Sequence, residues 1–165
     1  MNVIIKKSIS FIYLILQVPV YLISIPLIIL IRLIKPWFLI RWAAILSNRI
    51  GHFTINTELY CCERDAEINL PSQKYLDFFY IKKLVSNKQL EKMWRRSSLI
   101  ILPSWLLIPL SNVNSFINIF IPGGNYHKVG NTVENVHRNS ILDVHNLCEK
   151  FQPHIGFTEE EEFEG

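Results

Sequence analysis

The sequence has few of the residues and none of the short motifs that usually mark an enzyme. Its 165 residues include three cysteines and six glycines. It contains no CxxC pair, Walker loop, dinucleotide GxGxxG, HExxH or serine-nucleophile motif. The cysteine spacing matches no zinc motif, so we expect reduced thiols, no metal site and no cofactor.

Acidic residues are scarce until the end of the chain. Residues 1–158 hold all 17 Lys and Arg but nine of the 14 Asp and Glu, a net charge of +8. Such a positive body favours anionic membranes or phosphate-bearing ligands. A basic cluster within residues 82–96 has no nucleic-acid-binding motif around it, so we expect no nucleic-acid partner. The aromatic content of 12% and the lack of repeats exclude disorder and coiled coil.

One long apolar run begins near the amino terminus. Ser8–Ile31 is a stretch of 24 residues without a charge, and about 20 helical residues cross a bilayer. The run is too long for a signal peptide, and no small-residue cleavage site follows it, so a retained anchor over residues 1–35 is favoured over a cleaved signal. Pro19 and Pro26 predict a kink or a shallow entry into one leaflet. Basic residues are more numerous after the run, which predicts an inner (cytoplasmic) membrane protein with its globular part in the cytoplasm.

Apolar runs alternate with helical patterns in the region that follows. Strands are predicted at Trp37–Ile45, Leu76–Ile81 and Leu99–Leu102, with helices at Thr54–Arg64 and Asn87–Arg96. Further helices are predicted at Trp105–Ile121 and Ile141–Lys150. The β-α-β-α-β order predicts an α/β fold with a parallel sheet. We therefore expect an N-terminal membrane helix followed by an incomplete Rossmann-like domain over residues 36–157.

The last residues, 158–165, have the pattern of a helix start. Thr158 and Glu161 form a capping box, and acidic residues fill the first turn, where the helix dipole favours them. A helix start followed by so few residues predicts a chain cut short of its next domain. The alternative is a solvated acidic tail.

The turn after the first predicted strand contains the candidate site. Arg49 can pair with phosphate oxygens, Gly51 lets the backbone approach a ligand, and His52 can carry a proton near neutral pH. Asn56 lies four residues after His52, so both side chains face one crevice if the helix begins early. Glu58 lies on another side of that helix, where capping and solvent exposure are its ordinary roles.

Several segments resemble, in order, the amino-terminal part of a family of bacterial glycosyltransferases associated with surface-polysaccharide loci. The resemblance covers residues 37–165, and its most specific block is Arg49–Phe53 with Asn56–Tyr60. The other matching segments are Cys62–Asp65, Tyr75–Tyr80, Gln89–Trp94, Ile121–Gly124, Asp143–Asn146 and Phe157–Glu161. The Arg-Ile-Gly-His element is also similar to the loop after the first strand in heptosyltransferases of the two-Rossmann GT-B class.

This resemblance implies a membrane-associated glycosyltransferase of surface-polysaccharide or glycolipid synthesis. It would transfer a sugar from a nucleotide sugar to a lipid-linked or polysaccharide acceptor, with His52 as the catalytic base. Arg49, Gly51, Asn56 and Glu58 would bind substrate, as would Asp143 and His145. The family's donor-binding half would lie beyond residue 165, so this chain is expected to be the acceptor-side domain and inactive alone. The alternative is a non-catalytic membrane-anchored scaffold, or a decayed fragment, that binds lipid or a partner subunit.

Overall fold

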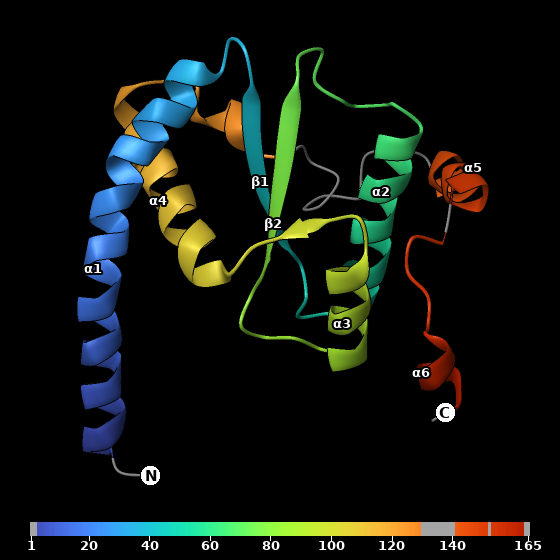
Figure 1. Cartoon of the computed structure of the whole chain (residues 1–165), viewed down its shortest axis with the longest axis horizontal. Helices are drawn as coiled ribbons and strands as arrows, with labels where there is room; N and C mark the ends of the chain where they lie inside the picture. The colour runs from blue at the N-terminus through green and yellow to red at the C-terminus, as the bar shows by residue number, and fades with distance from the viewer. Residues whose placement is uncertain (1–2, 130–140, 152, 164–165) are drawn as a thin grey trace.

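A computed structural model describes residues 3–129, 141–151 and 153–163. The chain forms a three-stranded parallel sheet with helices on both faces (Figure 1). The sheet order is β1-β2-β3, with strands at Leu39–Ile45, Tyr75–Ile81 and Ile100–Ile101. The predicted α/β class and parallel sheet are confirmed. The third strand is shorter than predicted, and Pro103 follows soon after it, where it has no N–H to extend the ladder.

The helices divide between the two faces of the sheet. α1 (Val3–Ile34) and α4 (Ser104–Phe120) lie on one side, and α2 (Thr57–Asp65) and α3 (Lys88–Arg96) on the other (Figure 1). The division follows from strand periodicity, because alternate side chains of a strand point to opposite faces. Ala43, Ile45, Phe79 and Ile81 enter the core beneath α2 and α3, whereas Trp42, Ala44 and Tyr80 enter the core shared with α1 and α4.

The carboxyl-terminal half of α1 belongs to the fold. Ser24, Ile28 and Ile31 are buried, and Arg32 Nε donates to Asn114 Oδ1 of α4 at 3.0 Å. Arg32 Nη1 also donates to the carbonyl of Ile121, just past the end of α4. By length and composition, Gln17–Ile34 can cross a bilayer, and little of this window is buried. The predicted apolar helix is therefore present, and one stripe of it packs against protein.

The helix after β1 begins irregularly. A π-helical segment, η1 (His52–Asn56), leads directly into α2, and it buries Phe53 and Asn56. α3 begins as the sequence predicts, because the side chain of Asn87 accepts a hydrogen bond from the backbone N–H of Leu90. The rest of the described chain forms a 3-10 turn η2 (Gly124–His127), α5 (Ile141–Phe151) and α6 (Glu159–Phe163).

The carboxyl-terminal segment returns to the sheet domain. α5 packs beside α2, as Figure 1 shows, and Arg96 of α3 pairs with Glu161 of α6 at 2.8 Å. The predicted capping box is confirmed, since Thr158 N–H donates to Glu161 Oε2 and Glu161 N–H donates to Thr158 Oγ1. The predicted helix at Ile141–Lys150 is confirmed as α5.

Candidate functional site

The turn after β1 lies at the carboxyl edge of the sheet and is fixed to the loop after β2. Ser47 is buried, its hydroxyl donates to the carbonyl of Leu84, and its own carbonyl accepts from the N–H of Ser86. These two bonds hold the loops that follow β1 and β2 against each other. Ligands of open parallel sheets bind at this edge because the strand-to-helix loops gather there.

The residues of this turn are accessible. Arg49 and Gly51 are exposed, and His52 is half-buried at the start of η1. A β-carbon added to Gly51 would meet nothing within 4 Å, and the residue has an ordinary helical φ of −61°. The backbone conformation at position 51 thus does not require glycine, and the space beside Gly51 is open to a ligand.

Two lysines extend the positive charge of the turn. Lys82 and Lys83 directly follow β2 and are exposed. Since Ser47 joins the loops after β1 and β2, these lysines belong to the same edge as Arg49. We call Arg49, Gly51, His52, Lys82 and Lys83 the carboxyl-edge site. Its charge suits an anionic group such as a phosphate.

Asn56 and Glu58 lie apart from this open edge. Asn56 is 2% exposed and Glu58 7% exposed, so neither shares an open crevice with His52. In the π-helical segment η1, Asn56 faces the core rather than the open edge. The Glu58 carboxylate faces the carboxyl-terminal segment, where it accepts from the His154 backbone N–H at 3.0 Å.

Asp143 and His145 lie on α5, far along the chain from β1. The side chain of Asp143 is outside the described residues, and His145 is exposed and pairs with Glu149 at 3.1 Å. The backbone at residues 143–145 is helical in α5 and not extended, so it is not the backbone that an Asp–His dyad at this spacing requires.

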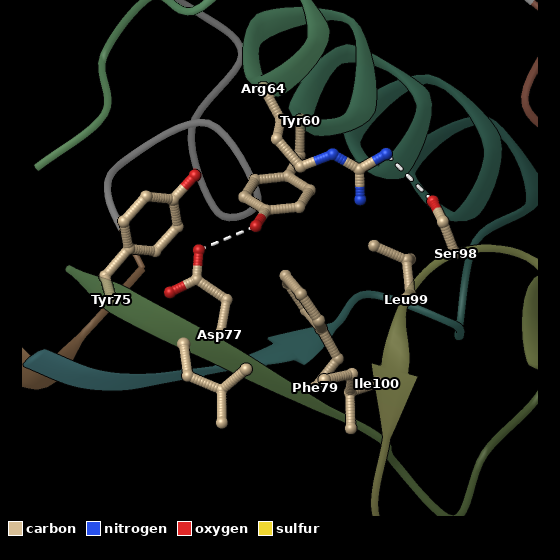
Figure 2. A pocket seen from close by; sticks show the side chains of 9 residues that line it. Tyr60, Arg64, Tyr75, Asp77, Phe79, Ser98, Leu99 and Ile100 are labelled. Atoms are coloured by element: carbon tan, nitrogen blue, oxygen red, sulfur yellow. Dashed lines mark hydrogen bonds between the residues drawn. The ribbon is translucent and has the colours of Figure 1, made fainter.

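A pocket of about 210 Å³ opens near the other end of the sheet, between α2 and the start of β2 and β3. Figure 2 shows Tyr60, Arg64 and Ser98 around it, with Asp77 beneath. The Asp77 carboxylate is already occupied: Arg41 Nε donates to Oδ1 at 2.7 Å and Tyr60 Oη donates to Oδ2 at 2.6 Å. The pocket therefore offers no free carboxylate, and it could not be predicted from local patterns because its residues come from separate elements.

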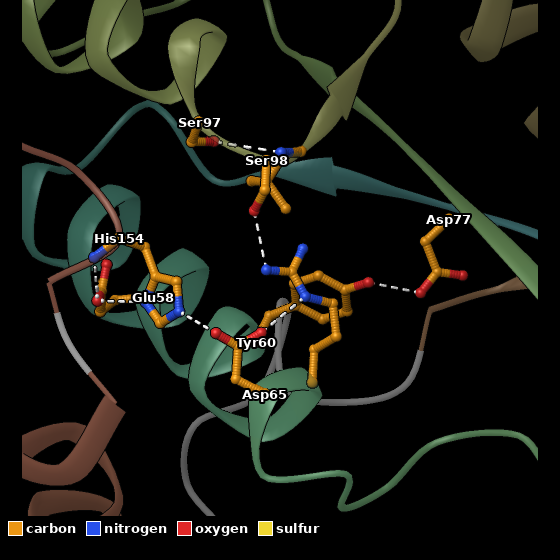
Figure 3. Close-up of polar contacts among 9 residues, drawn as sticks. Glu58, Tyr60, Asp65, Asp77, Ser97, Ser98 and His154 are labelled. Atoms are coloured by element: carbon orange, nitrogen blue, oxygen red, sulfur yellow. Dashed lines mark hydrogen bonds and ion pairs between the residues drawn. The ribbon is translucent and has the colours of Figure 1, made fainter.

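A second polar cluster lies on the outer side of α2 (Figure 3). His154 Nδ1 is 2.7 Å from Glu58 Oε1, and His154 Nε2 is 2.8 Å from Asp65 Oδ2. Burial alone would lower the pKa of His154, but the hydrogen bonds to the two carboxylates outweigh it and raise the pKa. Sequence reasoning missed this cluster because 96 residues separate Glu58 from His154.

Comparisons of the chain with protein-family models, with curated proteins and with solved structures each return no match. Function must therefore be inferred from the fold and from the two polar regions that flank the helix after β1.

Proposed function

We propose that the chain is the acceptor-binding, Rossmann-like domain of a membrane-associated glycosyltransferase. The sheet topology supports this proposal, because residues 128–129 pair with β1 on the side that β2 does not occupy. Lys128 forms a parallel bridge with Trp42, and Val129 N–H donates to the Trp42 carbonyl at 3.1 Å. With β2 on its other side, β1 is central, and the order β3-β2-β1 followed by residues 128–129 supports a doubly wound sheet.

The same topology favours one end of β1 as a binding site. The connections from β1 to β3 run through α2 and α3 on one face, whereas the connection to Lys128 runs through α4 on the other. In doubly wound sheets, the crevice opens where successive connections change face, outside the carboxyl ends of the strands. The carboxyl-edge site lies at this point, which is the observation that carries the proposal.

The direction of α1 supports a lipid-linked acceptor. A tight turn joins α1 to β1, with Trp37 N–H donating to the Ile34 carbonyl, so the helix runs opposite to the strand. The amino end of α1 therefore extends toward the end of the molecule that holds the carboxyl edge (Figure 1). A bilayer around that part of α1 would present lipid phosphates on the side of Arg49, Lys82 and Lys83.

In this proposal, each residue has a distinct role. Arg49 and the two lysines neutralise the acceptor phosphate, and the open space at Gly51 admits it to the helix amino terminus. His52 takes the proton from the attacking acceptor oxygen as the sugar leaves its nucleotide. The nucleotide-sugar donor would be bound by a second domain or polypeptide, as the glycosyltransferase resemblance implies.

Binding of a phosphorylated lipid tests the proposal. The full chain in detergent is titrated with a fluorescent polyprenyl phosphate and with the same lipid lacking the phosphate. We expect the phosphate to strengthen binding tenfold or more, since hydrogen bonds to charged groups contribute about 1.5–3 kcal/mol. Arg49→Ala or Lys82→Ala should reduce this gain. Lys74→Ala is the matched control, because Lys74 is an exposed base just before the opposite end of β2.

Equal binding of the two lipids, or an equal loss in Lys74→Ala, would refute an acceptor-phosphate site at this edge. Turnover is tested separately with UDP-, GDP- and CMP-sugars, using the chain alone and with the product of the adjacent reading frame. Sugar transfer that requires the second polypeptide and falls in His52→Ala supports a two-part enzyme. Phosphate-dependent binding without transfer in any combination would favour a membrane-anchored lipid-binding scaffold.

A further inference from the structure

The cluster on the outer side of α2 contains more than an ion pair. Glu58 and Cys62 are one helical turn apart, so they lie on the same face of α2. The ligand atoms of Glu58, Cys62 and His154 all lie within 4.8 Å of one another. Cys148 of α5, which packs beside α2, is a candidate fourth donor, because its thiol is close enough to that of Cys62 for each to shift the pKa of the other.

We propose that Glu58, Cys62, Cys148 and His154 form a zinc site that fastens the carboxyl-terminal segment to α2. The four donors are two sulfurs, one imidazole nitrogen and one carboxylate oxygen. This mixed set suits the borderline-soft Zn²⁺ rather than Mg²⁺ or Ca²⁺, which prefer oxygen ligands. Four protein ligands complete a tetrahedron, so the site is structural and leaves no position for a substrate.

The distances require small adjustments. Zinc bonds of about 2.0–2.3 Å place tetrahedral ligand atoms about 3.3–3.8 Å apart. Three of the donors, on Glu58, Cys62 and His154, lie within 4.8 Å of one another and move inward slightly, and the Cys148 side chain, which lies outside this group, moves further to complete the site. The 2.7 Å contact between His154 Nδ1 and Glu58 Oε1 lengthens by about 0.6 Å to admit the ion between them.

Asp65 occupies the position of an outer-shell partner. His154 Nε2 lies 2.8 Å from Asp65 Oδ2, on the side of the ring away from Glu58 (Figure 3). An imidazole that ligates zinc through one nitrogen commonly donates its other N–H to a carboxylate, which fixes the ring orientation. Nδ1 is then the ligand atom and Nε2 the proton donor.

The burial of the donors fits a closed site. Cys62 is fully buried and Glu58 is nearly so, and the His154 side chain is 10% exposed. Burial raises the pKa of Cys62 to about 12, so the free thiol is protonated at neutral pH. Zinc binding releases the protons of both thiols and that of the imidazolium, and metal affinity should therefore fall as the pH falls.

Cys61 provides a matched control. It is as buried as its neighbour Cys62, but it belongs to the apolar core beneath α2. Replacing either cysteine with alanine removes one buried sulfur from the same helix. A loss of metal that follows from general destabilisation would affect both variants, whereas the loss of a ligand affects one.

The test uses the full chain in detergent, purified with a reducing agent. Bound zinc is measured by elemental analysis, and the stripped protein is titrated with Co²⁺ and followed by its absorption spectrum. We expect one zinc per chain, and a tetrahedral Co²⁺ spectrum with a thiolate charge-transfer band. Cys62→Ala and Cys148→Ala should each weaken that band, and Cys61→Ala should retain it. Asp65→Asn should lower the affinity about 10–100-fold while leaving the spectrum unchanged.

Cys148→Ala is the decisive variant, because Cys148 is half-buried and its loss threatens the fold less than the loss of Cys62. An unchanged Co²⁺ spectrum in Cys148→Ala would overturn the site. So would metal affinity no higher in the parent chain than in the Cys62→Ala/Cys148→Ala double variant.

Discussion

Asp77 holds two buried groups in place, so its replacement tests how the sheet is stabilised. Arg41 of β1 lies directly opposite Asp77 of β2 in the parallel register. The side chains of this pair are 9% and 4% exposed. Burial raises the pKa of Tyr60, and the nearby negative charge of Asp77 raises it further. The Tyr60 hydroxyl therefore stays protonated and donates to the Asp77 carboxylate.

Asp77→Ala should destabilise the fold severely. The substitution leaves the Arg41 guanidinium buried without a counter-charge, which costs about 3–5 kcal/mol. Proteins of this size unfold with a total free energy of about 5–15 kcal/mol, and each kcal/mol shifts the melting temperature by about 2–4 °C. The expected decrease is therefore about 6–20 °C. Arg41→Met/Asp77→Leu should recover most of it, because no buried charge remains.

Thermal unfolding of the detergent-solubilised full chain, followed by circular dichroism, measures the effect. Glu91→Ala is the control: Glu91 also pairs with an arginine, Arg95, but that arginine side chain is 48% exposed. Exposed pairs contribute about 0–1 kcal/mol. If Asp77→Ala loses no more than Glu91→Ala, or if the double variant is less stable than Asp77→Ala, the buried charge does not act as argued.

Three further outcomes follow from the structure. Because the pKa of His154 is raised in the folded protein, its ion pairs stabilise the metal-free protein fully below about pH 6.5, and this stabilisation is lost as the pH rises through the raised pKa. Melting curves of the parent chain across pH should show this loss of stability. A loss of equal size in His154→Gln would contradict it. Gly124→Ala places a β-carbon 2.6 Å from an arginine nitrogen of α1 and 2.9 Å from Asn118, so we expect a loss of about 1–3 kcal/mol in chemical denaturation. Gly51→Ala should not lower stability, and a loss as large as that of Gly124→Ala would contradict the open space above Gly51. In vesicles of brominated lipid, single-tryptophan variants should show stronger quenching of Trp105, at the start of α4, than of Trp37, at the far end of α1; the reverse order would place the membrane at the other end of the sheet.

Local patterns were sufficient to predict most elements. The strands were recognisable because both faces of a parallel sheet are covered, so their residues are almost continuously apolar. The capping box of Thr158 and Glu161 was predictable because it depends on residues only three positions apart. The start of the helix after β1 was not predicted accurately, because the apolar spacing does not distinguish a π-helical turn from an α-helical one.

The polar clusters could not be predicted in the same way. Arg41 interrupts an apolar strand, and no local pattern explains it because its partner Asp77 lies 36 residues away. Short motifs such as HExxH place metal ligands close together in the sequence, whereas His154 meets Glu58 and Cys62 across the fold. Such pairings depend on strand order and on where α5 packs, and neither is encoded in a local window.

The apolar helix α1 is long enough to cross a bilayer and is also part of the core. Its outward stripe, including Leu22, Ile29 and Leu33, is exposed and suits lipid, while Ile28 and Ile31 are buried against the sheet domain. Each of these two isoleucines contributes about 1.5–3 kcal/mol by burial, a large share of a total near 5–15 kcal/mol. Removing α1 to obtain a soluble domain would also remove the hydrogen bonds from Arg32 to α4. A chain beginning after Ile34 should therefore lose cooperative unfolding in calorimetry, and full cooperativity in that chain would show that α1 and the rest of the core are separable.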